Sequence, residues 1–188
     1  ITADHMIGSR RVSAHVASFF EVDYSRVAQL RAAHKQSYAE RGVNLTRVLL
    51  HVGPGTFRPV AVHDPAEHRM DEEYFEVPTA AADRLRKTRS AGGRIVAVGT
   101  TAVRALESAC DANGGALGPA SGWTRKYILP PYRFQAVDAL LTNFHLPRTT
   151  LLLLVAAFAG PDLVREAYRH AVDEGYRFYS YGDAMLVI

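Results

Sequence analysis

The sequence predicts an α/β protein: a layered sandwich built on a mixed, mainly parallel sheet. Short runs of β-branched and aliphatic residues alternate along the chain with segments of helical period. Glycine or proline marks most of the changes between these two patterns. Hydrophobic residues make up 48% and charged residues 22%, the ordinary balance of a globular domain. Because no stretch has the composition of a linker, we expect one compact unit over residues 42–188, preceded by an N-terminal segment over 1–41.

Composition excludes several classes of protein. The longest apolar run, Leu151–Ala159, is half the length that a bilayer requires and is soon followed by Asp162. No signal peptide opens the chain, and its single cysteine, Cys110, excludes an internal disulfide. These features predict a cytoplasmic protein with no membrane partner. The net charge of +3 permits a nucleic-acid partner without requiring one.

The expected strands are apolar or β-branched runs that end at turn residues. Gly53-Pro54-Gly55 separates the first two, and Pro130-Pro131 separates another two. In chain order the strands are Thr46–Val52, Arg58–Val62, Tyr74–Val77, Arg94–Val98, Lys126–Leu129, Phe134–Leu141, Tyr176–Tyr181 and Ala184–Ile188.

The expected helices show apolar residues at a spacing near 3.6 and have capping residues at their ends. After Gly99, for instance, Val103, Leu106 and Cys110 fall on one face. Pro147 excludes a regular helix through His145, so either Thr149 or Thr150 is expected to be the N-cap of the apolar run that follows. The helices are about 24–41, Ala80–Ala91, the segment after Gly99, Leu151–Ala159 and Leu163–Glu174.

Four segments share a form in which a strand ends and a turn exposes polar side chains. They are His51–Phe57, Val98–Glu107, Thr142–Thr150 and Ser180–Ala184. In open α/β sheets the ligand crevice lies beyond the carboxyl ends of the strands, so these turns are expected to converge on one site. The helix that begins after Gly99 offers free N–H groups to an anion.

Each segment also has a purely structural interpretation. Arg104 and Glu107 are three residues apart on one helix, where they would form an ordinary ion pair. His51 suits either a base or a histidine of the core. The acidic stretch from Glu67 to Glu73 is typical of a solvated face, and its spacing predicts no metal site.

Taken in order, these segments resemble the S-adenosylmethionine:tRNA ribosyltransferase-isomerase family of queuosine biosynthesis. The resemblance covers about Gly42 to Ile188 and is carried by HVGPGTFRPV, EHRM, GGRIVAVGTTAVRALESA, SGWT, PPYRF, DALLTNFHLPRTTLLLLVAAFAG and YRFYSYGDAMLVI. It implies an enzyme that transfers the ribosyl unit of S-adenosylmethionine to the 7-aminomethyl-7-deazaguanine base of a tRNA anticodon, giving epoxyqueuosine. S-adenosylmethionine is then a substrate, and no metal is implied.

Under this resemblance, residue types suggest roles. His51 or His145 would transfer protons, and Asp183 or Glu73 would hold the cationic amine or sulfonium. Arg104 or helix N–H groups would receive the methionine carboxylate. The catalytic candidates are His51, His145 and Asp183, and the substrate-binding candidates are Gly53, Gly55, Thr56, Phe57, Glu73, Gly99, Thr100, Thr101, Arg104, Asn143, Arg148 and Tyr181.

The sequence also departs from the family. Residues 1–41 lack the family's usual segment, Asp71 stands where a histidine commonly follows Met70, and Arg125-Lys126 replaces an acidic and aromatic pattern. The family's N-terminal half and its inserted small β-barrel domain are absent from this sequence. Two alternatives therefore stay open: a paralogue that binds a nucleoside or RNA without catalysis, and a domain that self-associates or needs a separate N-terminal partner.

Overall fold

The computed structural model describes residues 37–38, 40–179 and 182–188. By internal contacts the chain divides into two units, Ile1–Leu45 and Thr46–Ile188, and the account below concerns the second. Most of the helix predicted over 24–41 lies outside the described residues, and so does the predicted site residue Tyr181.

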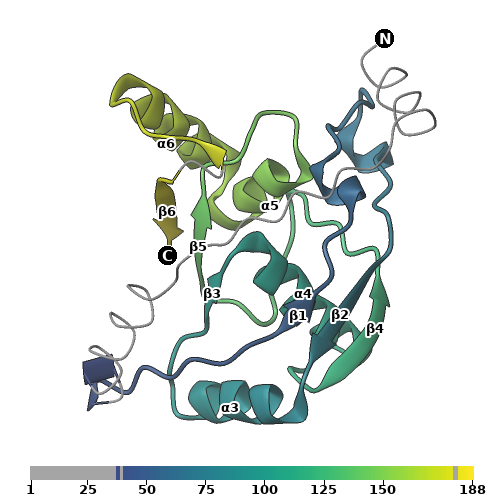
Figure 1. Ribbon diagram of the computed structural model, residues 1–188, viewed down its shortest axis with the longest axis vertical. Coiled ribbons are helices and arrows are strands. Elements are labelled where there is room, and N and C mark those ends of the chain that lie inside the picture. Colours follow the sequence, from purple (N-terminus) through teal and green to yellow (C-terminus); the bar gives the residue numbers. More distant parts are fainter. Residues whose placement is uncertain (1–36, 39, 180–181) are drawn as a thin grey trace, which may run out of the picture. The chain divides into compact units, whose positions relative to one another are not determined.

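Two three-stranded sheets form the frame of this unit (Figure 1). The first sheet has the order β1 (Leu49–Leu50), β2 (Glu73–Val77), β4 (Ala120–Thr124), and its neighbours are antiparallel. The second has the order β3 (Val96–Val98), β5 (Ala139–Asn143), β6 (Ala184–Val187). The mixed α/β class is confirmed. No strands close into a barrel in the part of the chain that the structure describes.

The prediction of a mainly parallel sheet is wrong. Among the described strands only β3 and β5 pair in parallel, whereas β5 and β6 are antiparallel. The cause lies between β5 and β6, where two helices follow each other directly, α5 (Thr150–Ala159) and α6 (Pro161–Asp173). A single helix would return the chain for a parallel strand. A second helix reverses it again at Gly160, so β6 enters from the opposite end.

The helices agree with the sequence to within a few residues. Besides α5 and α6, the structure has α3 (Thr79–Ser90) and α4 (Thr100–Ala112). From the helical spacing we expect Leu163, Ala167, Tyr168 and Ala171 on the inner side of α6, and one of these is wrong: Leu163 is exposed and Val164 is buried in its place. The residues that share a face with Val164 are Tyr168 and Ala171, which are spaced by one helical turn.

Three predicted strands are absent from the described residues. Arg58–Val62 makes only an isolated bridge, between Pro59 and Thr149, and neither Lys126–Leu129 nor the described part of Tyr176–Tyr181 is a strand. Their apolar residues are explained by burial rather than by sheet pairing, as Val60 and Ile128 show. Pro59 within the first run and Pro130-Pro131 directly after the second have no N–H to donate to a ladder.

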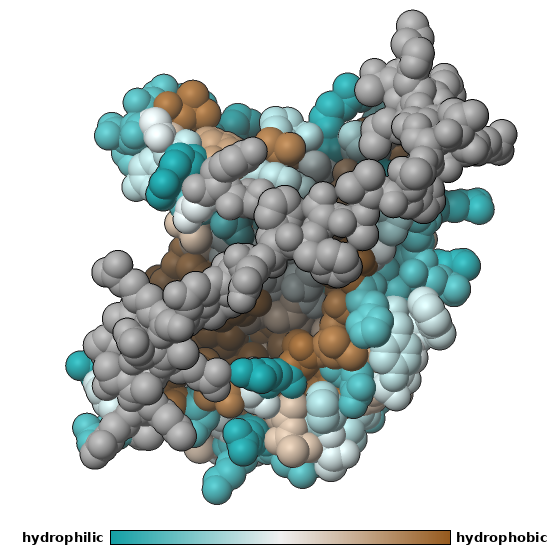
Figure 2. Space-filling view, in the orientation of Figure 1, coloured by the Kyte–Doolittle hydropathy of each residue, from teal (hydrophilic) through white to brown (hydrophobic). Residues whose placement is uncertain are grey.

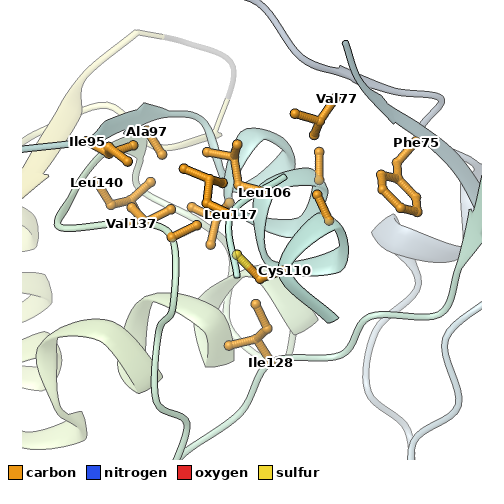
Figure 3. Close-up of a cluster of buried hydrophobic side chains, with 14 of the residues drawn as sticks. Phe75, Val77, Ile95, Ala97, Leu106, Cys110, Leu117, Ile128, Val137 and Leu140 are labelled. Carbon is orange, nitrogen blue, oxygen red and sulfur yellow. The ribbon is translucent and has the colours of Figure 1, made fainter. Parts of the chain in front are cut away.

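Helix α4 is the centre of the core. Every residue from Val103 to Cys110 is buried, because strands of both sheets contact this helix. The predicted apolar face of Val103, Leu106 and Cys110 is confirmed, and its opposite side is enclosed as well. Figure 3 shows Leu106 and Cys110 on this helix among side chains from the surrounding elements. The arrangement holds the N-terminus of α4 rigidly at the edge of the second sheet.

The N-cap of α5 is Thr149. Its hydroxyl Oγ1 accepts a hydrogen bond from Leu152 N (3.3 Å) and donates one to Leu146 O (2.7 Å). The turn is therefore tied to the helix that follows it, and the expected core helix is confirmed. Thr149, the last residue of the polar turn, thus caps the most apolar stretch of the chain.

We expect Thr149→Ala to lower the free energy of unfolding by about 1 kcal/mol, because it removes the acceptor of a helix N-terminal N–H. Urea denaturation followed by circular dichroism measures the change. Thr149→Ser keeps the hydroxyl and should lose much less. Equal losses in the two variants would show that the methyl group, rather than the cap, is responsible.

Candidate functional site

A cleft of about 360 Å³ lies where three of the predicted turns meet. The loop after β1, the turn from β3 to α4 and the turn from β5 to α5 each contribute to it. Its lining consists of Val52, Thr56, Phe57, Gly99, Thr100, Thr101, Thr142, Asn143, His145, Leu151 and Tyr179. The parallel pairing of β3 with β5 explains the convergence, since it brings the carboxyl ends of both strands to one edge.

The turn from β3 into α4 forms one wall. Gly99 has φ of 91°, a conformation that L side chains rarely adopt, and its N–H donates to Leu141 O of the neighbouring strand (2.8 Å). Thr100 and Thr101 then place the first turn of α4 in the cleft lining. The N–H groups of Ala102 and Val103 donate to Gly99 O (3.1 and 3.4 Å), so the N–H groups that an anion would meet are those of Thr100 and Thr101, where the helix dipole favours negative charge. This wall is suited to a carboxylate or phosphate.

His145 lies on the opposite side and is 7% exposed. Its Nε2 is 2.9 Å from the hydroxyl Oγ1 of Thr142, and its backbone N–H donates to the Tyr168 hydroxyl (2.7 Å). Burial lowers the pKa of His145 to about 4, and burial likewise raises the pKa of Tyr168 to about 12. At neutral pH the imidazole is therefore uncharged.

Five predicted site residues do not place their side chains in the cleft: Glu73 and Arg104, which are described below, and His51, Arg148 and Asp183. His51 is exposed, with its ring 5.7 Å from that of Tyr74 on the first sheet. Arg148, at φ of 59°, lines a separate hollow of about 300 Å³ with residues such as His63. Asp183 reaches the site only through its backbone, where its carbonyl accepts from Asn143 Nδ2 (3.4 Å).

The carboxylate of Asp183 is held by Arg177. It accepts hydrogen bonds from the backbone N–H of Arg177 (2.6 Å), from Nε (3.2 Å) and from Nη2 (3.1 Å). These hydrogen bonds hold the pKa of Asp183 below its ordinary value. The Asp183 carboxylate is thus used in hydrogen bonds to Arg177 within a local turn.

Glu73 and Arg104 form a buried ion pair behind the cleft. Their side chains are 1% and 3% exposed, and Arg104 Nη1 contacts Glu73 Oε2. Arg104 also donates to Thr56 Oγ1 (2.9 Å) and, through Nε, to Lys126 O (3.1 Å). The expected pair of Arg104 with Glu107 is wrong. Glu107 instead accepts from the Tyr132 hydroxyl (2.9 Å) and from backbone N–H groups on the loop before β5.

The ion pair fixes the loop that carries the cleft residues Thr56 and Phe57. Glu73 Oε1 accepts from Gly53 N (2.7 Å) and from Thr56 Oγ1 (2.6 Å), and Thr56 O accepts from Thr150 Oγ1 (3.3 Å). The loop itself is a short 3₁₀ helix, Pro54–Phe57. Gly55 is needed there because a Cβ would lie 2.2 Å from the Asp71 carboxylate.

Sequence reasoning missed four residues of the lining: Val52, Thr142, Leu151 and Tyr179. Thr142 could have been predicted from the sequence, because it stands three residues before His145 at the end of a strand. Tyr179 had none, since its position depends on the backbone hydrogen bond from its N–H to Phe144 O (2.7 Å).

The described residues include no candidate metal cluster and no candidate membrane-spanning helix. No three histidine, cysteine or acidic side chains there lie close enough together to hold a metal ion. Nor is any helix in that part of the chain long and apolar enough to cross a membrane.

Comparison with known proteins gives a consistent result. A family model described as "Queuosine biosynthesis protein" matches residues 29–187. The S-adenosylmethionine:tRNA ribosyltransferase-isomerase of Symbiobacterium thermophilum is 56% identical over 150 residues, which is 80% of this chain and 44% of that protein. The protein of the same name from Rhodopseudomonas palustris is 58% identical over 147 residues, covering 78% and 41% respectively.

A solved structure is also similar. The crystal structure of S-adenosylmethionine tRNA ribosyltransferase from Thermotoga maritima matches with a TM-score of 0.66 and 47% identity, over 82% of this chain and 48% of that chain. This chain thus spans less than half the length of the relatives that it matches.

Proposed function

This chain belongs to the queuosine biosynthesis protein family, and from that premise we propose that its cleft binds S-adenosylmethionine for transfer of the ribosyl unit to tRNA. The acceptor is the 7-aminomethyl-7-deazaguanine base of the anticodon, and the product is epoxyqueuosine. The observation that carries the proposal is that the N-terminus of α4 and a buried histidine with a lowered pKa line one cleft. A volume of about 360 Å³ lies within the range of small-molecule sites.

The lining suggests a pose for the sulfonium substrate. Its methionine carboxylate fits against the first turn of α4 beside Thr100 and Thr101. Its adenine fits against Phe57, whose ring is half exposed. In this pose the side-chain oxygen of Asn143 accepts from a ribose hydroxyl.

His145 is proposed as the base of the reaction. The positive sulfonium acidifies the adjacent ribose carbon, and a neutral imidazole is able to remove a proton from it. The imidazolium formed in this step is strongly acidic, because burial lowers its pKa to about 4. It is therefore suited to return the proton to the departing adenine.

Residue type alone suggested that Glu73 and Arg104 bind the charged groups of the substrate. In this proposal they have a structural role instead. Since each is the other's partner and both are buried, they support the loop rather than contact the substrate. The positive sulfonium is accommodated by the hydroxyl and amide oxygens of the lining.

The test is to measure S-adenosylmethionine binding by calorimetry, and then adenine release on adding tRNA that carries the 7-aminomethyl-7-deazaguanine base. A full-length relative is the positive control. We expect Thr101→Val to weaken binding about 5- to 10-fold through loss of one hydrogen bond. His145→Gln should leave binding nearly unchanged and slow adenine release by roughly 10²- to 10⁴-fold.

Full turnover by His145→Gln would remove this histidine from the mechanism. Binding of S-adenosylmethionine without adenine release would favour a second candidate, a nucleoside-binding unit that works with a separate polypeptide.

A further inference from the structure

A row of aromatic rings crosses the outward face of the first sheet, away from the cleft. Tyr74 of β2 is directly opposite Trp123 of β4, and the backbone N–H of His51 donates to Tyr74 O (2.8 Å), which places His51 at the same level beyond β1. The ring centroids are 5.7 Å apart for His51 and Tyr74 and 5.9 Å for Tyr74 and Trp123, with edge-to-face geometry in both pairs. Strands β1, β2 and β4 lie side by side in Figure 1.

The row is open to solvent. Trp123 is 69% exposed and His51 is exposed, whereas the next residue of β2, Phe75, faces the core. The core therefore does not account for these rings. The cleft does not use them either, because none of them is in its lining.

Guanidinium groups border the row on one side. Arg125, two residues beyond Trp123, is exposed and lies 3.3 Å from Glu72. Together with Arg69, Tyr127 and the acidic residues Asp71 and Glu72 it lines a hollow of about 720 Å³. In this hollow the Tyr127 hydroxyl donates to Pro65 O (3.0 Å), which fixes its ring beside that of His68.

We propose that this aromatic row is a stacking platform for unpaired RNA bases, with Arg125 and Arg69 contacting the phosphates. The proposal rests on the proposed function, in which tRNA is the substrate, and it names the surface that receives the RNA. Proteins read unpaired RNA by stacking its bases on aromatic side chains of open sheets, beside cationic groups that follow the backbone.

The surroundings of the row favour RNA over a protein partner. Leu49, Glu76 and Ser121 lie on one side of it and Glu72 and Arg125 on the other, so the aromatic strip is one residue wide. A protein interface has a broader apolar centre. An exposed apolar face of that kind lies on the second sheet instead, formed by Val96, Val98, Leu141 and Leu186. Figure 2 shows hydrophobic residues gathered in a hollow over β3 and β5.

The chain offers a direct probe of this surface. Trp123 is its single tryptophan, so tryptophan emission reports on the row alone. We expect an unmodified anticodon stem–loop RNA to quench this emission saturably, and a blunt RNA duplex to quench it far less, because duplex bases are already stacked. The affinity should fall steeply as salt is raised, because phosphate contacts release counterions.

Variants sharpen the test. Tyr74→Ala should weaken the affinity for the stem–loop, measured by anisotropy of labelled RNA, about 10-fold or more. His51→Ala, an exposed change that leaves the core intact, should weaken it several-fold, as should Arg125→Gln. The matched control is Val98→Ser on the exposed face of the second sheet, which should bind RNA like the parent chain.

Two outcomes would overturn the proposal. One is RNA binding that neither quenches Trp123 nor changes in the three variants. The other is a change of emission with protein concentration in the absence of RNA, which would make this face an interface between protein chains. Adenine release is measured separately. If the RNA quenches Trp123 but no adenine is released, the proposed reaction is contradicted and the proposed RNA-binding surface is not.

Discussion

Arg104→Met should lower the free energy of unfolding by about 3–5 kcal/mol, the largest loss that we expect from a single substitution at this site. The variant leaves the Glu73 carboxylate, on a side chain 1% exposed, without its countercharge. It also removes the donors to Thr56 Oγ1 and to Lys126 O. Since Thr56 and Phe57 share the loop that this pair supports, affinity for S-adenosylmethionine should fall as well. Urea denaturation and calorimetry measure the two effects.

A double-mutant cycle separates the buried charge from the lost packing. Glu73→Gln keeps an oxygen for the hydrogen bonds from Gly53 N and Thr56 Oγ1 but carries no charge. The double variant, Glu73→Gln with Arg104→Met, should therefore be more stable than Arg104→Met alone. If the two losses simply add, or if Arg104→Met costs less than about 1 kcal/mol, the charge of Glu73 is not what the arginine balances.

The convergence of the turns was predictable because it follows from local signals. Gly99 after a buried strand, and Pro147 followed by a capping threonine, each specify a turn within a few residues. Once β3 and β5 pair in parallel, with Val98 opposite Leu141, these two turns must meet at one edge. That is why most of the lining on the α4 and α5 sides could be named from the sequence.

The remaining errors concern partners that are distant in sequence. The partner of Arg104 is Glu73, which lies 31 residues earlier, so helical spacing suggested Glu107 instead. His51 illustrates a second limit. Side chains alternate along a strand, so its outward direction depends on its register with Tyr74, which the pattern of β1 alone does not specify. In the same way, the direction of β6 depends on two successive helices packing as a pair.

Acid should destabilise this fold through His145. The folded pKa is about 4 and the ordinary value is 6.5, so between these limits the unfolded chain binds a proton that the folded chain does not. Stability from this group is therefore complete above pH 6.5, declines as the pH falls, and is fully lost below pH 4. A shift of this size corresponds to roughly 3 kcal/mol. Urea denaturation at intervals from pH 7.5 to about pH 4 measures it.

The contribution of His145 is isolated by comparison with His145→Gln. The glutamine side chain at position 145 does not titrate and can still hydrogen-bond to Thr142. Its stability should fall less between pH 6.5 and 4 than that of the parent chain, and the difference between the two curves is the contribution of the imidazole. Val155→Ala, a cavity variant in α5, should lower the whole curve without changing its slope. Parallel curves for the parent chain and His145→Gln would mean that the folded protein binds this proton as readily as the unfolded chain. In that case the imidazole would not be the buried neutral base that the proposed reaction requires.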